Sequence, residues 1–306
     1  MSEQMAEGIK CALCPRQCHV DRDRHKGYCG ESRQVRVARA SLHMWEEPCI
    51  SGSRGSGTVF FSGCPLRCVF CQNRKIALGD KGRMLRKEQL SELFLMMQSK
   101  GAHNINLVTP THFVPQIIEA LKRAKNRGLS IPIVYNTSGY ESVETLRMLD
   151  GFVDIYLPDF KYYNAELSAK YSRAPDYFAC ASDAVEEMVR QTGSLVFDSG
   201  LMKRGVIVRH MVMPGHVKDA KAVIKYLYEK YRDDIYISIM NQYTPPDDLA
   251  DYPEISRRVT RREYEKVVEY AIELGVENAF VQKGGTAKES FIPDFDEELY
   301  LKEVLR

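Results

Sequence analysis

The sequence has no marked excess of charge of either sign and no long hydrophobic run. Lys and Arg together number 43, against 41 Asp and Glu, so charge gives no basis for a nucleic-acid track or a membrane-binding face. Nowhere do about 18 uncharged apolar residues follow one another, and the start from Met1 to Lys10 is polar. These absences predict a cytoplasmic protein that is neither secreted nor inserted in a membrane, with no nucleic-acid or membrane partner.

Cysteine, in contrast, is abundant, with nine in 306 residues. Seven of the nine fall into two tight groups, one near the N-terminus and one shortly after residue 60. In a chain without an export signal, the reducing cytosol argues against disulfides, so grouped thiols indicate metal binding or catalysis. We therefore predict that both groups bind metal.

From Thr58 onward, short β-branched or apolar runs alternate with amphipathic segments. The helix expected over 114–124 is apolar at i, i+3, i+4 and i+7, and another begins with a capping box at Thr260–Glu263 and ends at Gly275. The expected strands are 58–61, 104–108, 133–135, 153–157, 206–211, 235–239 and 279–281. This alternation predicts an α/β fold, a partial or open parallel (β/α) barrel whose ligands bind at the C-terminal ends of the strands.

The first 50 or so residues lack this alternation and contain the N-terminal cysteine group. We predict a small cysteine-rich, metal-binding extension over residues 1–50, followed by a barrel domain over residues 51–306. The segment Asp247–Arg258 is rich in Pro, Asp and Arg, which predicts a surface loop between the last units.

The second cysteine group follows the first expected strand, with Cys64, Cys68 and Cys71 in C-x3-C-x2-C spacing. Structural zinc and ordinary electron-transfer clusters use four protein ligands, so three thiolates leave one metal atom open to a substrate or cofactor. The alternative is a zinc site that takes a fourth ligand such as His112 or Cys49.

This loop, with Phe70 directly before its third cysteine, resembles that of the radical S-adenosylmethionine (radical SAM) superfamily. The resemblance implies a 4Fe-4S cluster on Cys64, Cys68 and Cys71, whose fourth iron is chelated by S-adenosylmethionine. It further implies a flavodoxin- or ferredoxin-like reductant, and cleavage of the cofactor to methionine and a 5′-deoxyadenosyl radical that abstracts hydrogen from a substrate. Phe70 would then pack near the adenine.

Three later motifs resemble those of the pyruvate formate-lyase activating enzymes. Asn136-Thr137-Ser138-Gly139 resembles their Asp-Thr-Asn-Gly segment, Asp159-Phe160-Lys161 resembles their Asp-x-Lys strand end, and Val208–Gly215 resembles their Arg-bearing strand before a Pro-Gly turn. The resemblance implies that the substrate is a glycine of a partner protein, a glycyl-radical enzyme. The alternative is a radical SAM enzyme that acts on another protein or on a small molecule.

The same motifs imply roles for single residues. Asn136, Thr137 and Asp159 would lie near the cofactor, while Lys161 and Arg209 would meet its carboxylate or a charge on the substrate. Charged side chains at the C-terminal ends of parallel strands face the mouth of a barrel, which agrees with these roles. The simpler alternative for Asp159 and Lys161 is an ion pair at the end of a strand.

One departure from the superfamily follows the second expected strand, where a Gly-Gly-Glu type motif usually contacts the methionyl amino group. This chain has Thr109-Pro110-Thr111-His112 there instead. By position, Thr109 and Thr111 are candidates to bind that amino group, and His112 joins Lys161 and Arg209 as a candidate catalytic residue.

The N-terminal group is a set of four thiols in C-x2-C-x3-C-x10-C spacing: Cys11, Cys14, Cys18 and Cys29. Four thiolates close a metal site completely, as in structural zinc sites and auxiliary iron-sulfur clusters, and the spacing does not choose between them. We favour zinc. Cys49 is expected to be buried and inert, and Cys180, at a helix entry, is expected to pack. Glu46 and Glu47 are expected near the mouth of the active site.

Two other functions fit parts of the sequence. Zinc in both cysteine groups would indicate an interaction scaffold rather than an enzyme. The glycines of Gly55-Ser56-Gly57 and Lys283-Gly284-Gly285-Thr286 would suit a phosphate-binding barrel, although isolated glycine motifs are weak signals.

Overall fold

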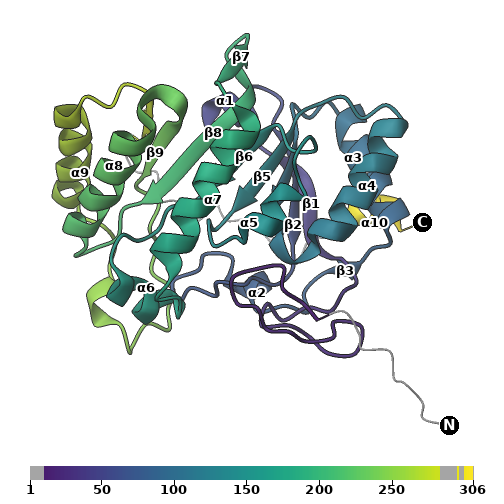
Figure 1. The fold of residues 1–306 in the computed structure, drawn as a ribbon, viewed down its shortest axis with the longest axis horizontal. Helices are drawn as coiled ribbons and strands as arrows, with labels where there is room; N and C mark the ends of the chain where they lie inside the picture. The colour runs from purple at the N-terminus through teal and green to yellow at the C-terminus, as the bar shows by residue number, and fades with distance from the viewer. Residues whose placement is uncertain (1–9, 283–294, 296–299, 306) are drawn as a thin grey trace.

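The computed structural model describes residues 10–282, 295 and 300–305 (Figure 1). These residues form one ten-stranded sheet in the order β10-β9-β8-β6-β5-β4-β2-β1-β3, with β7 paired to β8 outside this path. The strands are β1 (Arg36–His43), β2 (Ser56–Phe61), β3 (Arg83–Met84), β4 (Ile105–Val108), β5 (Ile133–Thr137), β6 (Ile155–Pro158), β7 (Val196–Asp198), β8 (Leu201–Met211), β9 (Tyr236–Met240) and β10 (Ala279–Val281).

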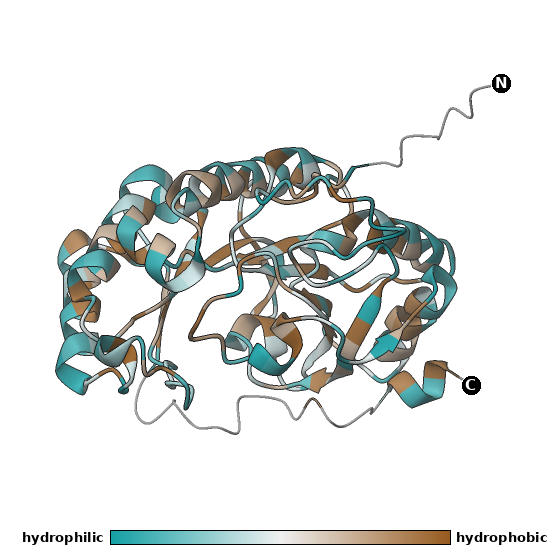
Figure 2. Cartoon of the chain, turned by 90° about the horizontal axis from the view of Figure 1, so that it is seen from below, coloured by the Kyte–Doolittle hydropathy of each residue, from teal (hydrophilic) through white to brown (hydrophobic). Residues whose placement is uncertain are grey.

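Helices follow most strands and cover the outer face of the curved sheet (Figures 1 and 2). The α-helices are α1 (Pro48–Ser51), α2 (Arg74–Ala77), α3 (Lys87–Ser99), α4 (Val114–Asn126), α5 (Val143–Arg147), α6 (Ala165–Ser172), α7 (Tyr177–Thr192), α8 (Val217–Tyr231), α9 (Arg261–Leu274) and α10 (Leu301–Val304). Short 3-10 helices are η1 (Thr111–Phe113), η2 (Arg232–Asp234) and η3 (Pro253–Ile255).

The parallel part of the sheet confirms the expected fold class. Every strand expected from the sequence is present, and β2, β4, β5, β6, β8, β9 and β10 pair in parallel in that order. The sheet ends at β3 and β10, which do not pair with each other among the described residues, so the barrel is open. Parallel strands of this kind bring their C-terminal ends to one edge of the sheet.

The strands and helices form for the reasons that the sequence pattern indicates. All residues of β2, β4, β5 and β6 are buried, as expected for strands covered on both faces. In Figure 2 the strands inside the molecule carry hydrophobic colours, while the outer sides of the helices are largely hydrophilic. The helix α9 has the expected capping box at Thr260, and Gly275 ends it in the left-handed conformation.

One strand lies where the sequence suggested only an irregular extension. β1 precedes residue 50 yet pairs antiparallel with β2 over most of its length. Its sequence has no helix partner and follows directly on the cysteine group, so the repeating βα pattern did not reveal it. The boundary between residues 50 and 51 stays a prediction, although it separates two paired strands.

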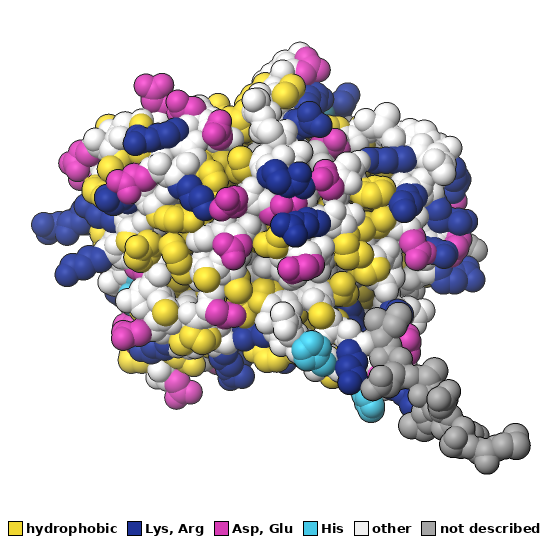
Figure 3. Space-filling view, viewed as in Figure 1, with side chains coloured by type: hydrophobic (Ala, Val, Ile, Leu, Met, Phe, Trp, Pro, Cys, Tyr) yellow, Lys and Arg dark blue, Asp and Glu magenta, His cyan; other side chains and the backbone are white. Residues whose placement is uncertain are grey.

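Residues 10–35 form loops that lie beside α2, at the end of the sheet where Figure 1 shows the dark purple segment. No helix in the described part of the chain is long and apolar enough to cross a membrane. On the face drawn in Figure 3, basic and acidic side chains are interspersed, in keeping with the balanced composition.

Candidate active site

A cavity of about 780 Å³ opens at the C-terminal ends of the parallel strands. It is lined by most of the residues that the sequence singled out: Cys64, Cys68, Phe70, Cys71, Thr109, Asn136, Thr137, Asp159, Lys161 and Arg209. These residues come from the loop after β2 and from the ends of β4, β5, β6 and β8. The fold thus brings together motifs that lie up to 145 positions apart in the sequence.

The cysteine loop connects β2 to α2 and presents its thiols to this cavity. Cys64, Cys68 and Cys71 are all partly exposed. The backbone N–H of Leu66 donates to Cys64 Sγ at 3.4 Å, and the hydroxyl of Ser172 donates to Cys68 Sγ at 3.0 Å. Hydrogen bonds to sulfur are a recognised means of tuning iron-sulfur clusters.

The protonation of these thiols follows from their surroundings. Burial raises the pKa of Cys64, and it raises the pKa of Cys68 to about 11 and of Cys71 to about 12, while the nearby Lys161 ammonium acts in the opposite direction. The thiols are therefore protonated at neutral pH until metal displaces the protons, because metal binding requires thiolates.

The donor set fits a cluster that leaves one iron open. Within residues 10–282, 295 and 300–305, no three His, Cys, Asp or Glu side chains lie close enough together to hold a single metal ion. A four-iron cluster binds its thiolates on different iron atoms, so its ligands lie farther apart than those of one zinc ion, where Zn–S is about 2.3 Å. Neither His112 nor Cys49 lines the cavity, so neither is placed as a fourth ligand.

Phe70 forms an apolar wall of the cavity beside the cysteines. Its ring is buried and packs against Tyr162, Tyr171 and Tyr243, with ring centroids 5.9 to 6.5 Å apart. This aromatic group provides a flat, rigid surface of the kind that stacks on a planar base.

Asp159, which lines the same cavity as the cysteines, pairs with two cations. Lys161 Nζ lies 2.5 Å from Asp159 Oδ2, and the Arg209 guanidinium lies 2.9 Å from Oδ1. Although burial opposes the charged forms, Arg209 and Lys161 lower the pKa of Asp159, and Asp159 raises the pKa of both cations. Arg209 also donates to Asn136 Oδ1 at 2.7 Å, which places the Asn136 amide at the same wall.

Glu46 and Glu47 complete this wall from outside the parallel strands. Both line the cavity, and Arg209 Nη1 donates to Glu46 Oε2 at 3.4 Å while Asn106 donates to Glu46 Oε1 at 2.9 Å. Burial raises the pKa of both carboxyl groups, and Arg209 opposes this. Their position near the mouth, expected from the sequence, is confirmed.

In the segment after β4, one candidate residue lines the cavity and the other two do not. Thr109 lines the cavity in a left-handed conformation, φ 56°, which is strained for a β-branched residue and typical of functional sites. Thr111 and His112 turn into η1 and do not line the cavity. Thr109 thus lies at the cavity, whereas Thr111 and His112 do not line it.

The side chains of Thr111 and His112 are instead buried and have partners in the core. The His112 ring lies 2.7 Å from the Ser62 carbonyl, and burial lowers its pKa to about 3, so the ring is neutral. The Thr111 hydroxyl donates to Glu141 at 2.6 Å.

Glu141 is a buried carboxyl that the sequence did not single out. It accepts hydrogen bonds from the hydroxyls of Thr111, Thr137 and Tyr135, and burial raises its pKa to about 7. Through Thr137, Glu141 holds the end of β5 at the cavity. A Glu two residues after a Gly turn carries no recognisable pattern, so only the fold reveals it.

The four N-terminal cysteines neighbour one another in pairs, and none of them lines the cavity, but no three of their side chains among the described residues lie close enough together to hold a single metal ion. Gly27 adjoins two of them, since a Cβ there would lie 3.4 Å from both Cys18 Sγ and Cys29 Sγ. Burial raises the pKa of Cys14 to about 12, with smaller contributions from the neighbouring Cys29 and Cys11. Whether these thiols bind zinc or an iron-sulfur cluster therefore stays a prediction.

The remaining cysteines are structural, as expected. Cys49 is buried in a cluster with Ile50 and Ile207, and burial raises its pKa to about 12. Cys180 in α7 packs partly against the core. The Ser56 hydroxyl of the first glycine motif bonds to Asn104 at 2.5 Å rather than facing the cavity, and Lys283–Thr286 lies outside the described residues.

Comparison with known proteins adds two sequence matches. The family profile described as "Radical SAM superfamily" matches residues 58–240. A protein of Methanocaldococcus jannaschii, named "Uncharacterized protein MJ0674", is 31% identical over 269 residues, which cover 85% of this chain and 74% of that protein.

One solved structure shows the same fold at lower identity, and another is reported for comparison. A radical SAM methyltransferase from Sphaerobacter thermophilus is similar with a TM-score of 0.52 and 15% identity, covering 74% of this chain and 66% of that chain. Streptococcus suis SuiB bound to S-adenosylmethionine has a TM-score of 0.49 and 14% identity, covering 72% and 48%. The chain thus spans just under two thirds of the first protein and about half of the second.

Proposed function

Because the chain belongs to the radical SAM superfamily, we propose that Cys64, Cys68 and Cys71 hold its 4Fe-4S cluster and that S-adenosylmethionine binds beside them. The observation that carries this proposal is the cavity itself. Three thiols line the same cavity as two cations and three carboxyl groups, those of Glu46, Glu47 and Asp159. The cofactor brings both an acid and an amine, which need partners of both signs.

The residues of the cavity have separate roles in this proposal. The cluster, when bound, supplies the electron that cleaves S-adenosylmethionine. Lys161 and Arg209 are placed to bind a carboxylate, since Asp159 holds both side chains in position. Phe70 offers an apolar face to the adenine, and the Thr109 carbonyl is a candidate acceptor for the methionyl ammonium.

The finer proposal is that the chain abstracts hydrogen from a glycine of a partner protein, as the activating enzymes do, using electrons from a flavodoxin- or ferredoxin-like protein. It is supported by the resemblance of Asn136–Gly139 and Asp159–Lys161 to the activase motifs, and by the place of both at the cavity. Hydrogen abstraction from another protein or from a small molecule is the alternative, and the cavity alone does not distinguish the substrates.

We also propose that Cys11, Cys14, Cys18 and Cys29 bind a second metal centre, either zinc or an iron-sulfur cluster. Thiolate ligands suit both. Elemental analysis of the purified protein distinguishes them, because zinc would appear in addition to the iron of the first site.

The first test is anaerobic reconstitution with iron and sulfide, followed by reduction in the presence of S-adenosylmethionine. We expect an iron-sulfur absorbance and formation of methionine and 5′-deoxyadenosine, measured by mass spectrometry. Cys71→Ala should abolish the product, whereas Cys180→Ala, which changes a cysteine outside the cavity, should not. Equal product from both variants would contradict the assignment, and zinc without iron would favour the scaffold alternative.

The substrate class is tested by following the abstracted hydrogen. The reconstituted protein is incubated with a cell extract in which glycine is deuterated at Cα, and the 5′-deoxyadenosine is analysed for deuterium. We expect deuterium in the product if a glycine is the substrate. Turnover that yields only unlabelled 5′-deoxyadenosine would point to a different substrate.

A further inference from the structure

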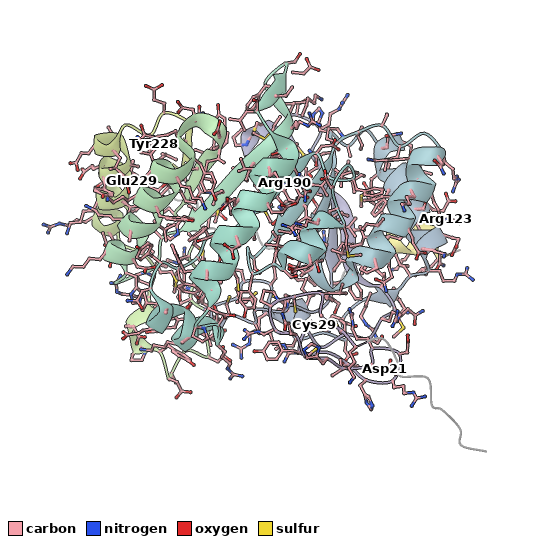
Figure 4. The ribbon with its side chains drawn as sticks, in the orientation of Figure 1. Asp21, Cys29, Arg123, Arg190, Tyr228 and Glu229 are labelled. Carbon is pink, nitrogen blue, oxygen red and sulfur yellow. The ribbon has the colours of Figure 1, made fainter. Side chains whose placement is uncertain are left out.

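The N-terminal cysteine segment, defined here as residues 10–33, is in main-chain contact with the cluster loop, residues 62–73. The backbone N–H of Cys64 donates to the carbonyl of Cys29 at 3.2 Å. Gly63 is packed against the same carbonyl, since a Cβ at Gly63 would lie only 2.6 Å from the Cys29 oxygen. Figure 4 labels Cys29 among the loops at this end of the molecule. The two cysteine groups are therefore attached to each other directly.

Arg16 makes a second connection from the same segment. Its Nε donates to the Pro65 carbonyl at 2.9 Å, and its Nη2 donates to the Leu66 carbonyl at 3.4 Å. Both carbonyls belong to the three residues between the first two cysteines of the cluster loop. The guanidinium thus fixes the main chain that determines the spacing of those two cysteines.

The same guanidinium also holds the end of α6, which touches the cluster loop. Arg16 donates to the carbonyls of Ser172 at 2.9 Å and Arg173 at 2.5 Å, where helix carbonyls lack helical partners. The Ser172 hydroxyl in turn donates to Cys68 Sγ, and the Val69 N–H donates to the carbonyl before Ser172 at 2.9 Å. Arg16 therefore positions a hydrogen-bond donor of a cluster ligand.

These contacts require an arginine rather than a general cation. The guanidinium lies 4.4 Å from the ring centre of Tyr28 and 5.0 Å from that of Tyr140, so the two aromatic rings hold it in place. Its planar fork bonds four carbonyls at once, which the compact ammonium of a lysine does not do.

We propose that Arg16 is a positioning residue of the cluster site, and that metal binding by the N-terminal cysteine segment, acting through Arg16 and Cys29, holds the cluster loop in its binding conformation. The inference rests on the proposed function, because it concerns the cluster that Cys64, Cys68 and Cys71 are proposed to bind. The role that it assigns to the N-terminal metal is retention of the neighbouring cluster.

The test compares variants of Arg16 with a matched arginine in the same segment. Arg24 is exposed and pairs only loosely with Asp21, at 3.7 Å among the described contacts. After anaerobic reconstitution, Arg16→Gln should lose its iron-sulfur absorbance to a chelator about tenfold faster than the wild type, a typical effect of changing a residue behind a metal ligand. Arg16→Lys should be intermediate, and Arg24→Gln should match the wild type.

A spectroscopic readout separates positioning from general destabilisation. The EPR spectrum of the reduced cluster should change in Arg16→Gln, recorded directly after reconstitution, and stay unchanged in Arg24→Gln. A second variant, Cys14→Ser, should lose the N-terminal metal by elemental analysis and also release the loop cluster faster.

Two results would overturn the inference. One is an Arg16→Gln protein with wild-type release rate and EPR spectrum, and the other is a Cys14→Ser protein that loses its metal yet keeps the cluster as long as the wild type. A wild-type protein that binds no iron at the cluster loop would instead contradict the proposed function, together with this inference.

Discussion

Asp159 joins the two cations that face the cavity, so its carboxylate sets their positions. Replacing it by asparagine leaves Lys161 and Arg209 partly buried with less compensating charge. We expect Asp159→Asn to lower the free energy of unfolding of the metal-free protein by roughly 2 kcal/mol or more, measured by urea denaturation. Asp150→Asn is the control, because Asp150 pairs with the half-exposed Arg190, labelled in Figure 4.

That exposed pair is expected to contribute less than about 1 kcal/mol. Equal losses for the two variants would mean that the Asp159 network is no more than a surface ion pair. The expected difference would also show that the cations need Asp159 before any cofactor binds.

His210 gives the stability a pH dependence. It is buried beside the Phe160 carbonyl, with its Nδ1 at 2.7 Å, and burial lowers its pKa from 6.5 to about 4. Between these two values the unfolded chain binds a proton that the folded chain does not. Stability contributed by the neutral ring is therefore complete above pH 6.5 and is lost as the pH falls towards 4.

His210→Asn should remove this dependence, because an asparagine Nδ2 can keep the donation to Phe160. We expect the slope of unfolding free energy against pH, measured between pH 6 and pH 5, to decrease by about 1 kcal/mol per unit. The control is His25→Asn, a change at an exposed ring. An unchanged slope in the His210 variant would show that this ring is protonated in the folded protein.

Single residues differ in how far the sequence predicts them. Cys64 and Asp159 could be predicted because each stands in a motif at a fixed distance from a strand. Glu141 could not, since its role comes from three hydroxyls that only the fold collects. His112 was a candidate catalytic residue by its position after a strand, but its side chain turns with η1 into the core, and the sequence does not show that turn.

The cluster loop, as an element, depends on a close approach to the N-terminal cysteine segment. Gly63 has φ 84°, and a Cβ there would lie 2.6 Å from the Cys29 oxygen. Gly215 has nearly the same backbone, φ 81°, with nothing within 4 Å of an added Cβ. Both glycines have a left-handed backbone, but only Gly63 has atoms close to the position of an added Cβ.

Gly215→Ala should therefore cost only the left-handed conformation, about 1 kcal/mol. Gly63→Ala should cost about 1–3 kcal/mol more, because the loop must move away from Cys29. Urea denaturation measures both costs, and iron content after reconstitution should fall only in the Gly63 variant. Equal losses of unfolding free energy and equal iron contents in the two variants would show that residues 10–33 can move away from an added Cβ at Gly63 at no cost.

Among the elements, the parallel strands and their helices could be predicted, and the antiparallel strands could not. Buried parallel strands contain short apolar runs such as 133–135, bounded by segments of helical periodicity. β1 contains two arginines and a histidine and pairs only with strands, so it breaks that rhythm. β7 is a short exposed strand against the start of β8, held by pairing rather than by burial.

The molecule as a whole assembles its site from more of the chain than the family profile covers. The profile matches residues 58–240, whereas Glu46, Glu47 and Gln282 also line the cavity. The sheet makes this possible, because β1 adds to one edge and β10 to the other, so both flanking segments reach the ends of the parallel strands. Residues outside the range that the family profile matches therefore form part of the cavity wall.

We therefore expect the bound cluster to stabilise the segments that contact its loop more than the rest of the molecule. The cluster loop, residues 62–73, contacts residues 10–33 and the end of α6, residues 168–173, whereas α8 packs mainly against α9 and β8. We expect removal of iron by a chelator to speed amide hydrogen exchange in those three segments and to leave α8 and α9 unchanged, measured anaerobically by mass spectrometry. A variant with all loop cysteines replaced by alanine should show the faster exchange before any chelator is added. Faster exchange over the whole chain would contradict this arrangement, because the cluster would then stabilise the fold globally rather than the segments attached to its loop.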